Sequence, residues 1–105
     1  MAATPEKLVK AKVVKVLEAE DVYYLFPATH GYGRSGVPDI VACVNGHFVG
    51  IECKANGGKP TALQVRELER IRRRNGVAVV VDETNLDMLL PLIRKLKTSI
   101  IKGAD

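Results

Sequence analysis

Two acids and a lysine flank a hairpin signal in the middle of the chain. Asp39 opens one apolar run, and Glu52 and Lys54 close the next. Asn45 and Gly46 separate the two runs. Both residues tolerate the positive φ of a type I′ turn, so the pattern predicts two strands joined by a two-residue loop.

This loop fixes the register of the predicted hairpin. Paired residue numbers sum to 91, so Asp39 falls opposite Glu52 in a non-hydrogen-bonded pair, with Cα atoms about 4.5 Å apart. Lys54 lies two residues beyond Glu52, on the same face. Carboxylates this close repel unless a cation lies between them, and their oxygens suit Mg²⁺ or Mn²⁺. A surface ion cluster on an amphipathic hairpin is the alternative.

Five features, in this order, resemble the VRR-Nuc (virus-type replication-repair nuclease) family of the PD-(D/E)xK nuclease superfamily. They are the segment Gly36-Val37-Pro38-Asp39, the segment Gly50-Ile51-Glu52-Cys53-Lys54, the Gly57-Gly58 loop, Gln64 on the next helix, and the run Gly76-Val77-Ala78-Val79-Val80. The similarity extends from about Glu6 to Leu92.

The resemblance implies metal-dependent hydrolysis of phosphodiester bonds in DNA. Asp39, Glu52 and the backbone carbonyl of Cys53 would bind Mg²⁺ or Mn²⁺. Lys54 would orient the attacking water or help to activate it. Only the carbonyl of Cys53 is implied, so its side chain should be replaceable.

Two auxiliary residues are also implied. Gln64 lies on the helical stripe of Leu68 and Ile71, and by resemblance it contacts the lysine, the water or the substrate; a structural hydrogen bond is the alternative. Glu6 lies three residues before Val9, on the inward side of the first helix, and by resemblance it helps to hold the metal or its waters. An exposed glutamate that favours the helix dipole is the alternative for Glu6.

The elements that must position these residues are read from periodicity and turn signals. We expect a helix from Pro5 to about Glu20 capped by Thr4, then a strand over Val22–Phe26 and a loop over Gly31–Gly36. The hairpin strands cover Val37–Val44 and His47–Cys53, and a helix follows from Thr61 to about Asn75, with Gly76 as its C′ residue. A strand over Val77–Val81, buried on both faces, leads to a last helix from near Asn85 that kinks or breaks at Pro91. The order helix-strand-strand-strand-helix-strand-helix predicts an α/β fold, a mixed β-sheet with a central hairpin flanked by helices. By resemblance this is a restriction-endonuclease-like core.

Basic residues gather on the helix after the hairpin. Arg66, Arg70, Arg73 and Arg74 share its outer face, where they suit contact with DNA phosphates, although a solvated face is the usual explanation for such a run. We expect Arg34, Ser35 and Lys59 to extend this DNA-binding surface.

Composition limits the remaining possibilities. The 105 residues predict a single domain over 1–105, and a net charge of +4 is compatible with nucleic acid. No apolar run reaches the roughly 18 residues that span a bilayer, and no signal peptide is recognisable. We therefore expect no membrane partner and a cytoplasmic location, in a bacterial or phage-infected host cell. Cys43 and Cys53 fall on opposite strand faces, so neither a disulfide nor a zinc site is expected.

The family resemblance favours a homodimeric resolvase of four-way (Holliday) junctions, because paired cuts need two sites. The apolar segment from Met88 to Ile101 is expected to contribute to the dimer interface. A nicking or flap nuclease without junction preference, and a non-catalytic DNA-binding module, are the alternatives.

Overall fold

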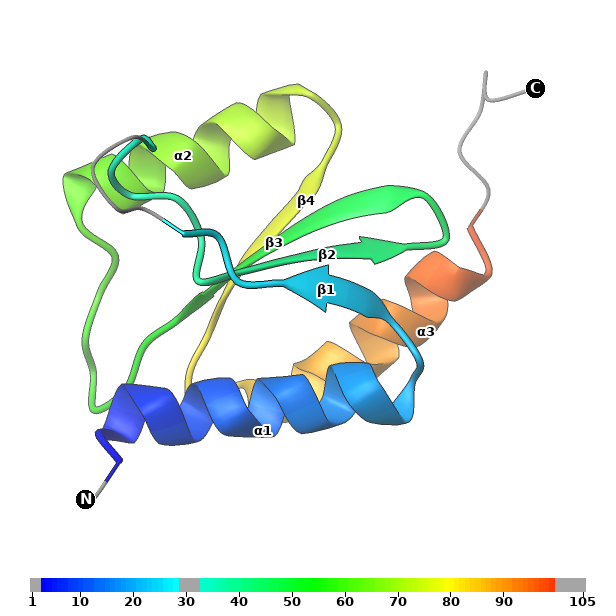
Figure 1. Ribbon diagram of the computed structural model, residues 1–105, viewed down its shortest axis with the longest axis horizontal. Helices are drawn as coiled ribbons and strands as arrows, with labels where there is room; N and C mark the ends of the chain where they lie inside the picture. The colour runs from blue at the N-terminus through cyan, green and yellow to red at the C-terminus, as the bar shows by residue number, and fades with distance from the viewer. Residues whose placement is uncertain (1–2, 29–32, 100–105) are drawn as a thin grey trace.

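The computed structural model describes residues 3–28 and 33–99. Its elements, in chain order, are α1 (Pro5–Ala19), β1 (Tyr23–Leu25), β2 (Ile40–Val44), β3 (His47–Cys53), α2 (Ala62–Arg73), β4 (Val77–Val81), the 3₁₀ turn η1 (Leu86–Met88) and α3 (Leu89–Lys97) (Figure 1). The predicted element order is confirmed. Gly31, Tyr32, Ile100 and Ile101, which the expectations above include, lie outside the described residues.

The sheet has the mixed topology that the hairpin signal predicts. Its strand order is β1-β2-β3-β4, with antiparallel pairing up to β3 and parallel pairing between β3 and β4. The hairpin register runs from Val44 opposite His47 to Ile40 opposite Ile51. Asn45 and Gly46 form the loop with φ of 51° and 84°, as a type I′ turn requires.

Helices cover the two faces of the sheet unequally (Figure 1). The main core lies under α1 and α3, where Val13, Leu17 and Ile93 pack on the inward residues of the strands. On the opposite face, α2 packs on β3 and β4. A Cβ at Gly50 would lie 2.8 Å from Cδ1 of Ile71 and 3.0 Å from Cγ of Pro38, so glycine there lets the side chains of α2 pack close to β3 without a shift.

The ends of α2 differ partly from expectation. Thr61 accepts a hydrogen bond from the backbone N–H of Gln64, which forms the N-terminal cap as predicted. At the other end, Asn75 with φ of 66° takes the left-handed C′ position that we expected for Gly76. Gly76 is the next residue, and its N–H donates to the carbonyl of Ile71 over 3.0 Å, which completes a Schellman motif.

The two outer strands differ partly from expectation. β1 is limited to Tyr23–Leu25, shorter than the predicted Val22–Phe26. β4 is an edge strand, but both of its faces are covered: Ala78 and Val81 are buried on opposite faces, and its other residues are half-buried. The apolar run therefore predicted the coverage of both faces and not the place at the sheet edge.

Part of the C-terminal helix packs into the core of its own chain. Leu89, Ile93 and Leu96 are buried in the core, so the expectation that this segment supplies a partner interface is wrong for these residues. Pro91 lies in the first turn of α3, where its missing N–H costs no hydrogen bond. The helical break precedes Pro91, at the junction of η1 and α3.

The hairpin turn also caps α3, which gives a stability prediction. The side-chain amide of Asn45 donates to the carbonyls of Leu96 (3.4 Å), Lys97 (3.2 Å) and Ser99 (2.8 Å). Asn45→Gly keeps the positive φ but removes these bonds, so we expect the free energy of unfolding in urea to fall by about 1–2 kcal/mol. Asn75→Gly is the control, since the side chain of Asn75 makes no hydrogen bond to any described residue. Equal stability of the two variants would contradict the capping role.

Candidate active site

Asp39 and Glu52 meet where the hairpin register places them. Asp39 directly precedes β2, and Glu52 lies on β3 beside Ile51, the partner of Ile40. The carboxylate Oδ2 of Asp39 accepts a hydrogen bond from the backbone N–H of Cys53 over 2.9 Å. The predicted juxtaposition of the two acids is therefore present in the fold.

Glu52 is a buried acid with few positive neighbours. It is 2% exposed, and its Oε2 accepts a hydrogen bond from Nε2 of Gln64 over 3.0 Å. Nζ of Lys54 lies 3.7 Å from the same oxygen. Burial raises the pKa of the Glu52 carboxyl to about 7, the Asp39 carboxylate adds to the rise, and Lys54 opposes it. The charged pair is thus incompletely neutralised by the protein itself.

Gln64 combines the two roles that the sequence left open. Its Oε1 accepts a hydrogen bond from the backbone N–H of Thr61, which closes a capping box, while its Nε2 holds Glu52. Both ends of the amide are therefore occupied, and the first turn of α2 is linked to the acidic pair.

Glu6 lies at the edge of the site. Its side chain is 55% exposed, so the expectation that it faces inward is wrong; Val9 is the first residue of α1 that reaches the core. Oε1 of Glu6 nevertheless lies 3.8 Å from Nζ of Lys54. Within residues 3–28 and 33–99, no three His, Cys, Asp or Glu side chains converge as a metal cage. Glu6 therefore reaches the site through Lys54.

Neither cysteine takes part in a disulfide. Cys43 is exposed and Cys53 is buried, as their opposite faces predict. Burial raises the pKa of the Cys53 thiol to about 12, with the carboxylates of Asp39 and Glu52 adding to the shift. The thiol therefore stays protonated and inert near neutral pH.

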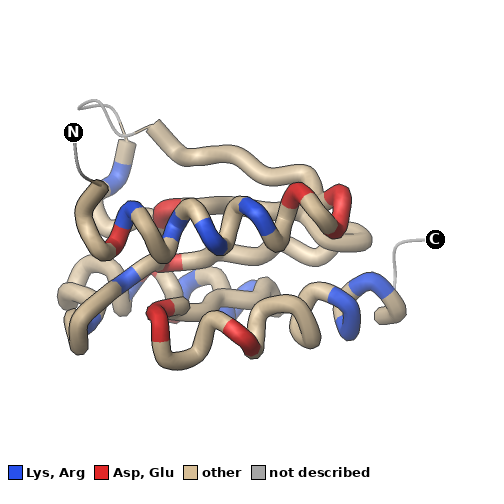
Figure 2. Tube along the Cα trace, turned by 90° about the horizontal axis from the view of Figure 1, so that it is seen from below, with Lys and Arg blue, Asp and Glu red and all other residues tan. Residues whose placement is uncertain are grey.

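Basic side chains flank the acids on both sides of the sheet. The predicted set is exposed: Arg34, Ser35, Lys59, Arg66, Arg70, Arg73 and Arg74. A second set of basic residues, which the sequence analysis missed, lies along α1: Lys7, Lys10, Lys12 and Lys15. Figure 2 shows blue segments along this helix. The signal available in the sequence was four lysines within nine residues. Arg72 is different, because its guanidinium donates to the backbone carbonyl of Ala78.

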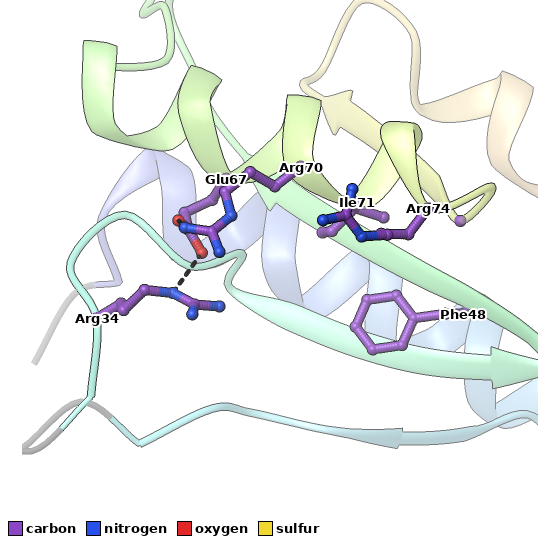
Figure 3. A pocket seen from close by; sticks show the side chains of 7 residues that line it. Arg34, Phe48, Glu67, Arg70, Ile71 and Arg74 are labelled. Carbon is purple, nitrogen blue, oxygen red and sulfur yellow. Dashed lines mark hydrogen bonds and ion pairs between the residues drawn. The ribbon is translucent and has the colours of Figure 1, made fainter.

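Glu67 is a second buried acid, which the sequence analysis did not single out. It is 4% exposed, and Nε of Arg34 donates to its Oε1 over 3.1 Å (Figure 3). Oε2 of Glu67 lies 3.5 Å from Nε of Arg66 and 4.0 Å from Arg70. Its spacing of three residues from Gln64 and four from Ile71 would have placed it on the inward stripe of α2.

The Arg34–Glu67 ion pair ties the segment before Asp39 to α2. A second contact does the same: Gly36 has φ of 84°, and a Cβ there would lie 2.6 Å from the backbone carbonyl group of Leu63. The backbone that leads into Asp39 is thus held against the helix that carries Gln64.

Known proteins share this arrangement. No protein-family model matches the sequence. A solved structure described as a VRR_NUC domain superposes with a TM-score of 0.69 and 30% sequence identity, over 85% of this chain and 97% of that one. The chain belongs to the VRR-Nuc family. A protein of Acyrthosiphon pisum secondary endosymbiont phage 1, named "Putative nuclease p44", is 44% identical over 62 residues, 58% of this chain and 67% of that protein.

The membership confirms the family resemblance and the restriction-endonuclease-like fold inferred from the sequence, and it makes this VRR-Nuc chain a nuclease. None of the helices in the described ranges has the length and apolarity needed to cross a membrane.

The pKa of Glu52 predicts how the stability of the metal-free VRR-Nuc domain depends on pH. A folded-state pKa of about 7, above the ordinary 4.5, means that the folded protein binds this proton more tightly than the unfolded chain. Stability from this group is complete below pH 4.5 and is lost as the pH rises to 7, on the order of 3 kcal/mol. We expect Glu52→Gln to be more stable than the wild type at pH 8 but not at pH 4.5.

Urea unfolding at pH 4.5 and pH 8, with EDTA present, measures this difference. Glu69→Gln is the control, because Glu69 lies on the exposed side of α2 and pairs with Arg72. A wild-type pH slope that survives unchanged in Glu52→Gln would show that another group controls it.

Proposed function

We propose that this chain is a metal-dependent endonuclease that hydrolyses phosphodiester bonds in DNA. The observation that carries the proposal is the Asp39–Glu52 pair, in which Glu52 is buried and Asp39 half-buried, with Lys54 and Gln64 both in contact with Glu52. A purely structural role would favour an apolar side chain at position 52, since a buried carboxylate beside a second one destabilises the fold. The printed name of the phage relative, a nuclease, agrees with hydrolytic chemistry.

The donor set fits Mg²⁺ or Mn²⁺. Two carboxylates converge, and their mutual repulsion raises the pKa of Glu52, which a divalent cation would relieve. Asp39, Glu52 and the carbonyl of Cys53 would hold the ion and leave positions for water and a substrate phosphate. Such an ion supplies Lewis-acid stabilisation of the phosphoryl oxygens and lowers the pKa of a bound water.

The side chains around the acids orient the reactants. The hydrogen bond from Gln64 fixes one oxygen of Glu52, and the N–H of Cys53 fixes one oxygen of Asp39. Lys54, between Glu52 and Glu6, presents its ammonium where it can position the attacking water or stabilise negative charge on the phosphate. Glu6 would orient waters through Lys54 and is not a direct ligand in this arrangement.

The basic residues on α2 and α1 would bind the DNA backbone. Arg73 and Arg74 form no ion pair with any described residue, so their charge is available to phosphates. Lys59 and Ser35 are exposed on loops at either side of α2 and would extend the contact.

A homodimer that cuts four-way junctions is the finer form of the proposal. One chain offers one acidic pair, and symmetric resolution needs two. Since Leu89, Ile93 and Leu96 are buried in the core, the exposed Tyr23 and Leu25 on the edge strand β1 are the better surface for a second copy. A nicking or flap nuclease shares the same site. A non-catalytic DNA-binding module is disfavoured, because Asp39, Glu52 and Lys54 are all present and assembled.

Cleavage of labelled four-way junction, flap, duplex and single strand with Mg²⁺ tests the activity. We expect Asp39→Ala, Glu52→Ala and Lys54→Ala each to lower the rate by about 100-fold or more, because each removes a metal ligand or a charge that stabilises the transition state. Cys53→Ala is the matched control between two of these positions, and it should retain cleavage. Full activity in any of the three site variants would show that the observed nuclease is a contaminant.

Metal binding has a readout independent of cleavage. Mg²⁺ or Mn²⁺ should raise the Tm of the wild type, because the ion binds only the folded acidic pair. The rise should disappear in Glu52→Ala. A rise of equal size in that variant would place the ion elsewhere.

The oligomeric state separates the resolvase from the simple nicking enzyme. We expect sedimentation at micromolar concentration to give twice the chain mass of 11.4 kDa, and paired cuts in a junction. Tyr23→Glu should reduce self-association, whereas Leu63→Glu, an exposed apolar position on α2, should not. A monomer both free and bound to DNA would exclude the resolvase and favour the nicking nuclease.

A further inference from the structure

A pocket on the same face of the sheet as the acidic pair has a lining that the phosphodiester chemistry does not use. It has a volume of 390 Å³ and lies between α2 and the strands (Figure 3). Phe48, Ile71 and Gly76 form an apolar side, and Arg34, Arg70 and Arg74 supply the charge. The volume lies at the lower end of the range for small-ligand sites.

The ring of Phe48, which lines this pocket, is partly exposed to solvent. Phe48 is 48% exposed although it lies on a central strand, because α2 covers only part of this face. In Figure 3 its ring lies across the pocket from α2, below Ile71 and Arg74. An exposed ring beside guanidinium groups is the combination with which proteins hold a base by stacking and its phosphate by charge.

Glu67 shows that the arginines are held in place. It is the buried carboxylate of the pocket lining, and it holds the Arg34 guanidinium at 3.1 Å. Its second oxygen, Oε2, is buried and has no hydrogen-bond partner among the described residues, although Arg66 and Arg70 lie nearby. Three lining guanidinium groups against one carboxylate leave the pocket positive, so an anionic occupant is favoured.

The pocket lies on the same side of the sheet as the acids. Phe48 and Glu52 are four residues apart on β3 and share a face, which corresponds to about 13 Å along the strand. That distance equals the axial rise of about four nucleotides in B-DNA, at 3.4 Å each, and fewer nucleotides span it in an extended strand. A strand whose phosphate lies at Glu52 can therefore reach Phe48 with a nucleotide a few positions away.

We propose that this pocket binds an unpaired nucleotide of the DNA substrate, with the base stacked on Phe48 and its phosphate held by Arg34, Arg70 and Arg74. The proposal rests on the DNA nuclease function above and gives that site a preference for unpaired or branched DNA. A paired base cannot enter, because its face is already stacked and its edge is hydrogen-bonded within the duplex. Glu67 acts as a positioning residue for Arg34 and Arg70.

The test compares a duplex that carries one unpaired nucleotide with the same duplex fully paired. Affinities are measured in EDTA, so that no cleavage occurs. We expect the wild type to prefer the bulged duplex, and Phe48→Leu to lose about 5- to 150-fold in affinity for the bulged DNA only. Phe48→Tyr, which keeps the ring, should restore the preference.

Two control variants define the effect. Phe26→Leu alters another half-exposed phenylalanine, 50% exposed and outside the pocket, which lies under Lys10 of α1. It should leave the preference for the bulged duplex unchanged. Arg73→Ala removes an α2 arginine that does not line the pocket, and should weaken both DNAs alike. A 5-iodouracil placed at the unpaired position should photo-cross-link to Phe48, as mass spectrometry of the peptide would show.

The outcomes separate this inference from the proposed function. Cleavage by the wild type, together with an unchanged preference in Phe48→Leu or a cross-link elsewhere, overturns the pocket but keeps the nuclease. Absence of both DNA binding and cleavage overturns both. Saturation by free thymidine monophosphate at micromolar concentration, with equal affinity for the two duplexes, would assign the pocket to a free nucleotide and overturn the proposal.

Discussion

The placement of Glu52 beside Asp39 is the constraint on which the other features of this face depend. A carboxylate that is 2% exposed loses most of its hydration, and a second carboxylate next to it adds repulsion. The protein offers one amide from Gln64, one distant ammonium from Lys54, and one backbone N–H, which Asp39 takes. These contacts orient the oxygens but leave negative charge uncompensated. This uncompensated charge is what supports the proposed cation site.

Holding two like charges together requires rigid surroundings, and the local structure supplies them. The Asn45-Gly46 turn fixes the register, and the Asn45 side chain anchors that turn to the end of α3. On the other side, Gly50 lets α2 approach β3 closely enough for Gln64 to reach Glu52. The acids are thus positioned by both layers of helices, so the loss of either layer would allow them to separate.

The sequence predicted those parts of the structure that depend on local geometry. The two-residue turn, the register, the cap at Thr61 and the order of elements follow from φ preferences and periodicity, and they are confirmed. Some features that depend on tertiary coverage were missed. The run Val77–Val81 gives no sign that it forms a sheet edge. Leu89, Ile93 and Leu96, which the sequence offered to a partner interface, are buried in the core. The inward place of Glu67, by contrast, could have been read from its helical spacing and was overlooked.

The two buried glutamates, Glu52 on β3 and Glu67 on α2, differ in the number of basic side chains near them, and this difference separates their roles. Glu67 has guanidinium groups within 3.1, 3.5 and 4.0 Å, so its charge is met by the protein. Glu52 has one lysine at 3.7 Å, and that lysine is shared with Glu6. Replacement of Lys54 by arginine would fill space that the proposed metal ion and phosphate need. The poorer neutralisation of Glu52 therefore supports the proposed chemistry there, whereas the fuller neutralisation of Glu67 holds Arg34 and Arg70 of the neighbouring pocket.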